Sequence, residues 1–310
     1  GLDYLVGVAE KIIRSNPSRI IFIAPVTTFL LCLFAGTSHV VYSLLPIIAE
    51  VSAKKRIRPE RRLSISVVAA HLALTGSPMS AATAALAAIL AYNGANVQIM
   101  LVCIPACFIG VIAGCFAALK MGKELSADPL FLEKMKDPDF SNWINSGIRK
   151  TERELKAGAK TAVLVFGMAI LLVVLSGAFP ALLPNLGAGK ENFAIRADGS
   201  IKMVGIIVVV TLSASAAIML LTKTSSEAVM KASLFPAMAA AVVSVFGVVW
   251  MSATFMAHND ATIREALGSA VNQYPWTFAF AVFGMGILMF SQAATTRAMM
   301  PLGLSLGLTP

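Results

Sequence analysis

The sequence predicts an all-α polytopic membrane protein with the inverted-repeat architecture of a secondary transporter. Hydrophobic residues make up 57% of the 310 residues and charged residues only 13%, and the mean hydropathy is +0.80, whereas a soluble chain carries about 25% charged residues. The apolar residues also lie in blocks long enough to span a bilayer. Finally, Leu31–Pro46 and Met289–Pro301 interrupt an apolar stretch in the same way, with small polar residues. Paired interruptions of this kind are typical of transporters that bind substrate near the bilayer midplane.

Seven apolar segments define the expected order of elements along the chain. They cover 20–51, 63–92, 98–119, 160–183, 202–221, 235–257 and 276–309. We assign their sides from the distribution of basic residues, because Lys and Arg collect in cytoplasmic loops. The break 52–62 holds six Lys/Arg and one Glu, and the long break 120–159 is also basic, so both should be cytoplasmic and the turn at Asn93–Asn96 external.

The first apolar segment, 20–51, has basic residues at both ends, so both ends should face the cytoplasm. It is too short for two full spans, which need about 20 residues each, but long enough for a re-entrant hairpin. Its turn should fall at Ala35–Ser38. The segment 276–309 also has the length of a hairpin, enters from the opposite side and should turn near Ser291–Thr296.

The two opposed hairpins imply that the chain is divided into three parts. Residues 1–119 form a first repeat, incomplete at its N-terminus. Residues 120–159 form a cytoplasmic amphipathic connector, and residues 160–310 form a second repeat, incomplete at its C-terminus. The chain starts at Gly1 and stops within an apolar stretch, so we expect it to be the middle of a longer transporter.

Two further local patterns predict helix boundaries. The segment 63–92 is too long for one span and contains Thr75–Pro78, where proline removes a hydrogen-bond donor and glycine loosens the turn. We therefore expect two half-helices, 63–75 and 79–92. In the connector, Asp128-Pro129 and Asp137-Pro138 should each begin a helix.

Three polar clusters at these interruptions are the candidate substrate site. Hydroxyls, glycines and half-helix ends can hold a carboxylate through free backbone N–H groups and the helix dipole. The candidate substrate-binding residues are Gly36, Thr37, Ser38 and His39; Thr75, Gly76, Ser77, Pro78 and Ser80; and Ser291, Gln292, Thr295, Thr296 and Arg297.

Each candidate has a structural alternative. Any single Ser or Thr in a membrane helix can bond the backbone or a neighbouring helix instead of a substrate. His39 could carry a proton or bond a carbonyl at the turn. Arg297, a strong charge well inside an apolar segment, is a functional candidate by default, and the alternative is that it snorkels to the surface.

The charge pattern narrows the kind of ligand. The segments 20–51, 63–92 and 276–309 contain no acidic residue at mid-depth, since Glu50 lies at an interface, so an anionic substrate is favoured over a cationic one. The net charge of +9 reflects topology and lipid contact, not nucleic-acid binding. The four cysteines lack metal-ligand spacing. We expect a carrier and not an enzyme, with no catalytic residue, no metal and no cofactor.

Several stretches together resemble one known family. They are Gly1–Val6 (GLDYLV), Ala35–Val51 (AGTSHVVYSLLPIIAEV), Thr75–Ala82 (TGSPMSAA), Lys156–Thr161 (KAGAKT) and Ser291–Pro301 (SQAATTRAMMP). Across essentially its whole length the chain resembles the anaerobic C4-dicarboxylate transporter (Dcu) family. The resemblance implies a multi-pass carrier of the bacterial inner membrane that exchanges fumarate, malate or aspartate for succinate in anaerobic respiration. Two departures are Arg297, where lysine is expected in relatives, and His71, where glutamine is expected.

Two hypotheses follow for function. The first is secondary active transport of C4-dicarboxylates, by exchange or uptake, through alternating access. The alternative is a membrane co-sensor that regulates a dicarboxylate-sensing receptor kinase and transports only weakly. The partners compatible with these hypotheses are dicarboxylate anions, the lipid bilayer, a second copy of the chain in a homodimer and, for the alternative, the sensor kinase.

Overall fold

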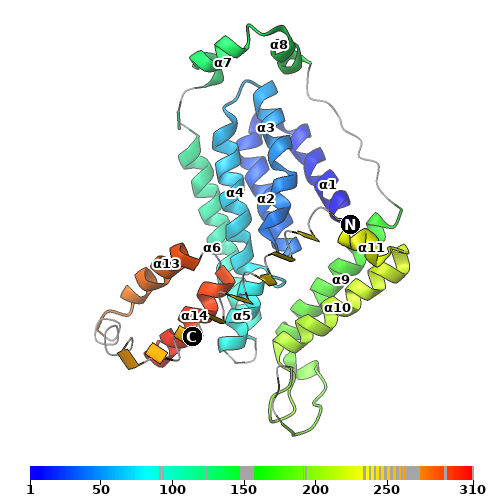
Figure 1. Ribbon diagram of the computed structural model, residues 1–310, viewed down its shortest axis with the longest axis vertical. Coiled ribbons are helices and arrows are strands. Elements are labelled where there is room, and N and C mark those ends of the chain that lie inside the picture. The colour runs from blue at the N-terminus through cyan, green and yellow to red at the C-terminus, as the bar shows by residue number, and fades with distance from the viewer. Residues whose placement is uncertain are drawn as a thin grey trace. The chain divides into compact units, whose positions relative to one another are not determined.

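The computed structural model describes most of the chain. It covers residues 1–90, 92, 94–119, 121–122, 124–146, 157–190, 192, 194–232, short stretches between 235 and 262, 273–289 and 292–308 (Figure 1). Within these residues the regular elements are helices, apart from one antiparallel bridge between Ile195 and Ile201. The chain divides into two compact units, which are described separately.

Five helical stretches are long and apolar enough to cross a membrane. They are Pro17–Ala35, Pro59–Leu90, Ala95–Ala118 (α6), Ala159–Ala178 (α9) and Met203–Thr222 (α10). A shorter apolar helix, α13, covers Thr277–Met289. The predicted all-α polytopic class is therefore confirmed. The predicted segment 235–257 lies only in part within the described residues.

The first unit comprises Gly1–Ser80, Gln98–Leu172 and Thr211–Lys223. It begins with α1 (Leu2–Ser15) and α2 (Ile20–Ala35), continues through the 3₁₀ helix η2 (Ser38–Ser43) to α3 (Leu45–Lys54), and then enters α4 (Pro59–Gly76). Pro46 and Pro59 lie in the first turns of α3 and α4, where a missing N–H costs nothing. The helices α2 and α4 pack along each other in a core of aliphatic and small residues.

The chain folds back on itself between α2 and α3. Arg14 near the end of α1 donates from Nη2 to Glu50 Oε2 at 2.7 Å, and Lys54 lies 3.0 Å from the other oxygen of the same carboxylate. The two ends of the segment 20–51 therefore lie side by side within this unit. That arrangement is the one a re-entrant hairpin requires, and its insertion in the bilayer stays a prediction.

The predicted interruption of the next segment is present. The helix α4 ends at Gly76 and α5 covers Ala81–Leu90, so the break falls at residues 77–80. Sequence analysis placed the half-helices at 63–75 and 79–92. The observed break lies where Gly76 and Pro78 remove helix-forming capacity.

The connector forms three short helices, η3 (Leu125–Ala127), α7 (Pro129–Lys134) and α8 (Pro138–Asn145). The side chain of Asp128 accepts from the backbone N–H groups of Leu130 and Phe131, and that of Asp137 accepts from Asp139 N–H. Both predicted helix starts are therefore confirmed as N-caps.

The second unit comprises Ala81–Val97, Val173–Val210 and Thr224–Pro310. It contains η4 (Pro180–Leu182), α11 (Ser226–Met230), α13 and α14 (Gln292–Ser305). Here α5 and α14 pack side by side. The boundaries of the two units differ from those of the predicted repeats. The repeats concern sequence symmetry and stay a prediction.

The second hairpin differs from the first in one respect. The turn was expected near Ser291–Thr296, but the chain is already helical from Gln292 onward. Ala294, Thr295 and Ala298 are buried on one face of α14, and small residues at this spacing allow two helices to approach closely. Pro301 lies inside α14, whereas its counterpart Pro46 begins α3. The start of α14 therefore overlaps the predicted turn, and the position of the turn stays a prediction because Ser291 lies outside the described residues.

Candidate functional site

The first polar cluster lies at the end of α2. Gly36 adopts a left-handed conformation (φ 69°) and its N–H bonds the carbonyl of Cys32, so it ends the helix in the way glycine does most readily. Thr37 is the N-cap residue of η2, and its Oγ1 accepts from His39 N–H at 3.3 Å. Gly36, Thr37, Ser38 and His39 are all half-buried.

The second cluster lies at the break between α4 and α5. Ser77 is fully buried, and its hydroxyl donates to the carbonyl of Leu33 at 2.7 Å while accepting from Met79 N–H at 3.3 Å. Leu33 belongs to the last turn of α2, where carbonyls lack intrahelical partners. The Ser77 hydroxyl therefore ties the broken helix to the hairpin.

The two interruptions touch each other. A Cβ atom added to Gly36 would lie 2.6 Å from Met79 Cβ and 2.9 Å from the Met79 carbonyl carbon. On the other side of the break, a Cβ atom at Gly76 would lie 2.5 Å from Ile104 Cγ1 of α6. Both glycines are required because other segments of the same chain approach them closely. The first two predicted clusters therefore form one region within the first unit.

The remaining members of this region differ in their surroundings. Thr75 makes a side-chain hydrogen bond with Cys107 of α6. Pro78 and Ser80 are buried, and Ser80 N–H bonds the Ser77 carbonyl at 3.1 Å. His71, which sequence analysis linked to support of the break, is exposed on α4.

The third cluster lies in the second unit, on α14. Thr295 is buried, Thr296 is half-buried, and Gln292 and Arg297 are exposed. Ser291 lies outside the described residues. Thr83 was missed in the sequence analysis: it is 1% exposed on α5, the helix that packs against α14. Its position one helical turn after Ser80 was the available signal.

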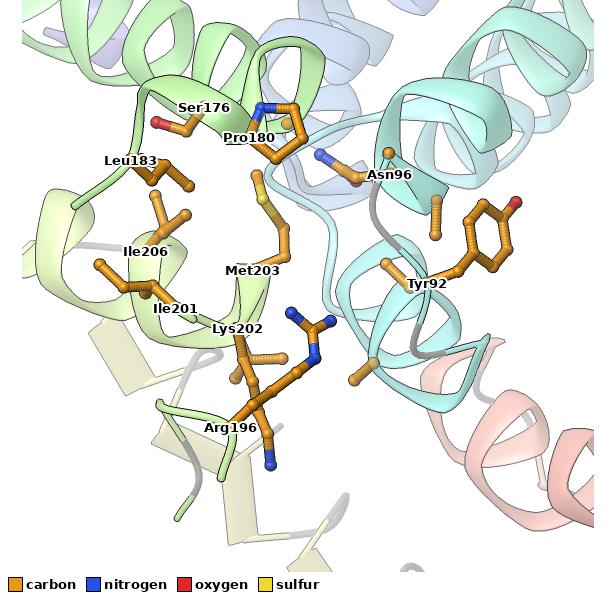
Figure 2. Close-up of a pocket in the computed structure, with 16 residues that line it drawn as sticks. Tyr92, Asn96, Ser176, Pro180, Leu183, Arg196, Ile201, Lys202, Met203 and Ile206 are labelled. Carbon is orange, nitrogen blue, oxygen red and sulfur yellow. The ribbon is translucent and has the colours of Figure 1, made fainter. Parts of the chain in front are cut away.

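Sequence analysis also missed a cavity within the second unit, of about 290 Å³. The start of α6, the end of α9, the connection 184–201 and the start of α10 line it. Figure 2 shows the guanidinium of Arg196 and the amide of Asn96 directed toward Met203, among the lining side chains. Nothing in the local sequence marks Asn96 and Arg196 as neighbours, because they lie far apart along the chain.

The electrostatics of this cavity are dominated by cations. Lys202 donates to the carbonyl of Asn192 at 2.8 Å, and Arg196 Nη1 donates to Ser200 Oγ at 3.3 Å. Hydrogen bonds from the Ser200 hydroxyl and N–H hold the pKa of Asp198 below its usual range, so Asp198 is ionised near neutral pH. Asp198 offsets part of the positive charge of Arg196 and Lys202.

Helices of membrane-crossing length, two of them interrupted or folded back at polar residues, define the class of a multi-pass membrane carrier. Comparison with known proteins identifies the family of carriers. The family model for the anaerobic C4-dicarboxylate membrane transporters (DcuA_DcuB) matches residues 1–310. The chain belongs to this family, and it is a multi-pass protein of the inner membrane.

Individual relatives match along the whole chain. It is 35% identical over 315 residues to the C4-dicarboxylate transporter DcuA of Wolinella succinogenes. It is 30% identical over 313 residues to DcuA of Escherichia coli K12, and 32% identical over 318 residues to the anaerobic C4-dicarboxylate transporter DcuB of Escherichia coli O6:H1. Each match covers 100% of this chain and 69% of the relative. No solved structure matches the chain significantly.

Proposed function

We propose that this protein transports C4-dicarboxylates such as fumarate, malate, aspartate and succinate across the bacterial inner membrane, by exchange or uptake. The observation that carries the proposal is the match of the whole chain to a transporter family, with relatives named for C4-dicarboxylate transport. Two interrupted segments that touch at Gly36 and Met79 give such a carrier a place for its substrate.

We propose that residues of the three polar clusters named above each contribute to substrate binding during transport. Thr37, Ser38 and Thr75 are half-buried, so their hydroxyls can exchange protein contacts for a carboxylate more readily than the fully buried Ser77. Hydroxyls and backbone N–H groups are uncharged donors, and each hydrogen bond from them to a carboxylate contributes about 1.5–3 kcal/mol net, which permits release. Arg297 supplies the full positive charge among the predicted site residues.

The proposed mechanism is alternating access in an inverted-repeat fold with two re-entrant hairpins. The Arg14–Glu50 ion pair supports the first hairpin, because it joins the elements at both ends of 20–51. The packing of α13 against α14 supports the second, because these helices are consecutive and adjacent. The break between α4 and α5 provides the discontinuous helix that such carriers place at the substrate.

Transport is tested with the purified protein in proteoliposomes. Radiolabelled succinate should enter saturably, and unlabelled fumarate inside the vesicles should accelerate entry if the carrier exchanges its substrates. Butyrate has the same chain length but one carboxylate, so it should compete poorly. Absence of saturable succinate entry in vesicles with correctly folded protein would reject transport and leave the co-sensor hypothesis as the alternative.

A further inference from the structure

The cavity in the second unit contains a buried amide with unmet hydrogen-bonding capacity. Asn96 is 2% exposed, and neither its Oδ1 nor its Nδ2 has a hydrogen-bond partner among the described residues. Leaving a buried polar group unsatisfied destabilises a protein in general. A side chain kept in this state, and directed into a cavity (Figure 2), has the position of a ligand-binding group.

Two long helices begin at the same cavity. The helix α6 begins at Ala95 and runs for 24 residues, and α10 begins at Met203 and runs for 20 residues. Residues at both starts line the cavity. The first N–H groups of a helix lack intrahelical partners, and the helix dipole places partial positive charge there. The cavity therefore receives positive potential from two helices as well as from Arg196 and Lys202.

Charge, size and polarity together specify the ligand class. The guanidinium of Arg196 can bind a carboxylate with two parallel hydrogen bonds. The Nδ2 group of Asn96 can donate a further one. A volume of about 290 Å³ lies at the lower end of the range for small-molecule pockets. The apolar side chains of Leu183, Met203 and Ile206 complete the lining and suit a short carbon chain.

We propose that this cavity is a second dicarboxylate site, which binds a substrate carboxylate between Arg196, Asn96 and the starts of α6 and α10. The inference rests on the proposed function, because it takes the ligand to be the transported anion. The two connections that meet here, 93–96 and 184–201, both belong to the side predicted to be external. The site would capture substrate from that side before transport.

The direct test is protection of a cysteine inside the cavity. M203C in the intact carrier, reconstituted in phosphatidylcholine vesicles, is labelled with a membrane-impermeant thiol reagent, and the label is read at position 203 by mass spectrometry. Succinate should slow labelling saturably. In the same background, Arg196→Gln should weaken protection about ten- to a hundredfold, as expected for loss of a charged hydrogen bond. Arg196→Lys should restore part of it.

The matched control is Lys190→Gln. Lys190 is exposed on the same connection and does not line the cavity, so this variant removes the same charge and should change protection less than about twofold. Asn96→Asp retains the shape of the side chain and places a negative charge at a helix start, where the helix dipole offsets part of the cost of burying the charge. It should nonetheless abolish protection, because it repels the carboxylate.

Three results would overturn the proposal. They are no protection by succinate in vesicles that transport it, equal loss with Lys190→Gln and Arg196→Gln, and protection that requires added phosphatidylglycerol instead of succinate. The last result would assign the cavity to a lipid phosphate. Failure of the transport proposal is seen separately: protection by succinate in a protein without succinate flux would retain the binding site and reject transport.

Discussion

Gly36 shows how one residue can be constrained by two independent causes. Its φ of 69° is unfavourable for other residues, and Met79 occupies the space where a side chain would begin. The sequence contains this residue as part of a break between apolar stretches. The structure adds the reason that alanine cannot replace it.

Gly36→Ala should therefore destabilise the protein. Left-handed backbone at a non-glycine residue costs about 1–3 kcal/mol, and the contact with the Met79 backbone adds to this because backbone cannot easily move. The measurement is the thermal unfolding midpoint in detergent. Gly7→Ala is the control: Gly7 lies in α1 with open space around it, and alanine favours helix there. Equal midpoints for both variants would contradict the assigned constraint.

In this conformation the Ser77 side chain has a structural role. Its hydroxyl bonds Leu33 and Met79, so Ser77→Ala should lower the free energy of unfolding by about 1–3 kcal/mol, because the Leu33 carbonyl loses its donor. Chemical unfolding in mild detergent measures this. If Ser77 also binds substrate when the carrier changes state, KM for succinate should rise as well; unchanged stability would contradict the structural role.

Substitutions at Arg297 test whether transport requires its positive charge or only its packing. A dianion in a low-dielectric site needs compensating positive charge, and a helix end supplies only about half a charge. Arg297→Lys should therefore retain substantial succinate uptake, while Arg297→Gln should lose most of it without loss of inserted protein. The exposure of Arg297 on α14 leaves the guanidinium accessible. Normal uptake by Arg297→Gln would mean that the side chain only snorkels.

At the scale of elements, Arg61 of α4 makes several contacts with the connector and with the end of α6. Arg61 is largely buried and lies 2.6 Å from Glu124 Oε1. It also donates to the carbonyls of Leu119, at 2.9 Å, and Gly122, at 2.7 Å, and to that of Met121. These carbonyls follow the end of α6, so Arg61 closes that helix as well as binding the connector.

Arg61→Gln should release the connector, because glutamine cannot replace all the hydrogen bonds to the carbonyls of Leu119, Met121 and Gly122. Each buried carbonyl left without a donor costs about 1–3 kcal/mol. Trypsin should then cut faster at Lys134 and Lys136, which are exposed on the connector. Arg56→Gln is the control, since exposed Arg56 makes one 3.4 Å contact with Asn145. Equal cleavage rates in the two variants would show that Arg61 does not hold the connector.

The elements also show what local sequence can predict. The break at 77–80 and the N-caps at Asp128 and Asp137 were predicted because their causes are local. Proline and glycine act through their own backbone, and the aspartate side chain accepts from N–H groups two or three residues later. Ala294, Thr295 and Ala298, within or next to the predicted turn at Ser291–Thr296, were not predicted to pack inside the second unit. That contact is not encoded by neighbouring residues.

At the scale of the whole molecule, the charge distribution predicts sidedness. A cysteine at exposed Lys55 should be labelled from the cytoplasm only, because the basic break 52–62 is held inside. Lys190, also exposed, is the better external position than Asn96, whose burial would block labelling from either side. A cysteine at Lys190 should be labelled from outside only. Labelling of both positions from one side would reject the predicted topology.

The sequence by itself determined the membrane class, the family and the places where helices are interrupted. The apolar composition indicates that the chain lies in a lipid bilayer, and glycine and proline change the backbone conformation at their own positions. Only the tertiary structure decided which polar groups are already bonded and which are not. The Ser77 hydroxyl bonds Leu33, 44 residues away. The amide of Asn96, which lines the same cavity as Arg196, has no hydrogen-bond partner within the described part of the chain. The two side chains look equally polar in the sequence, because hydrogen-bond satisfaction depends on contacts between distant segments.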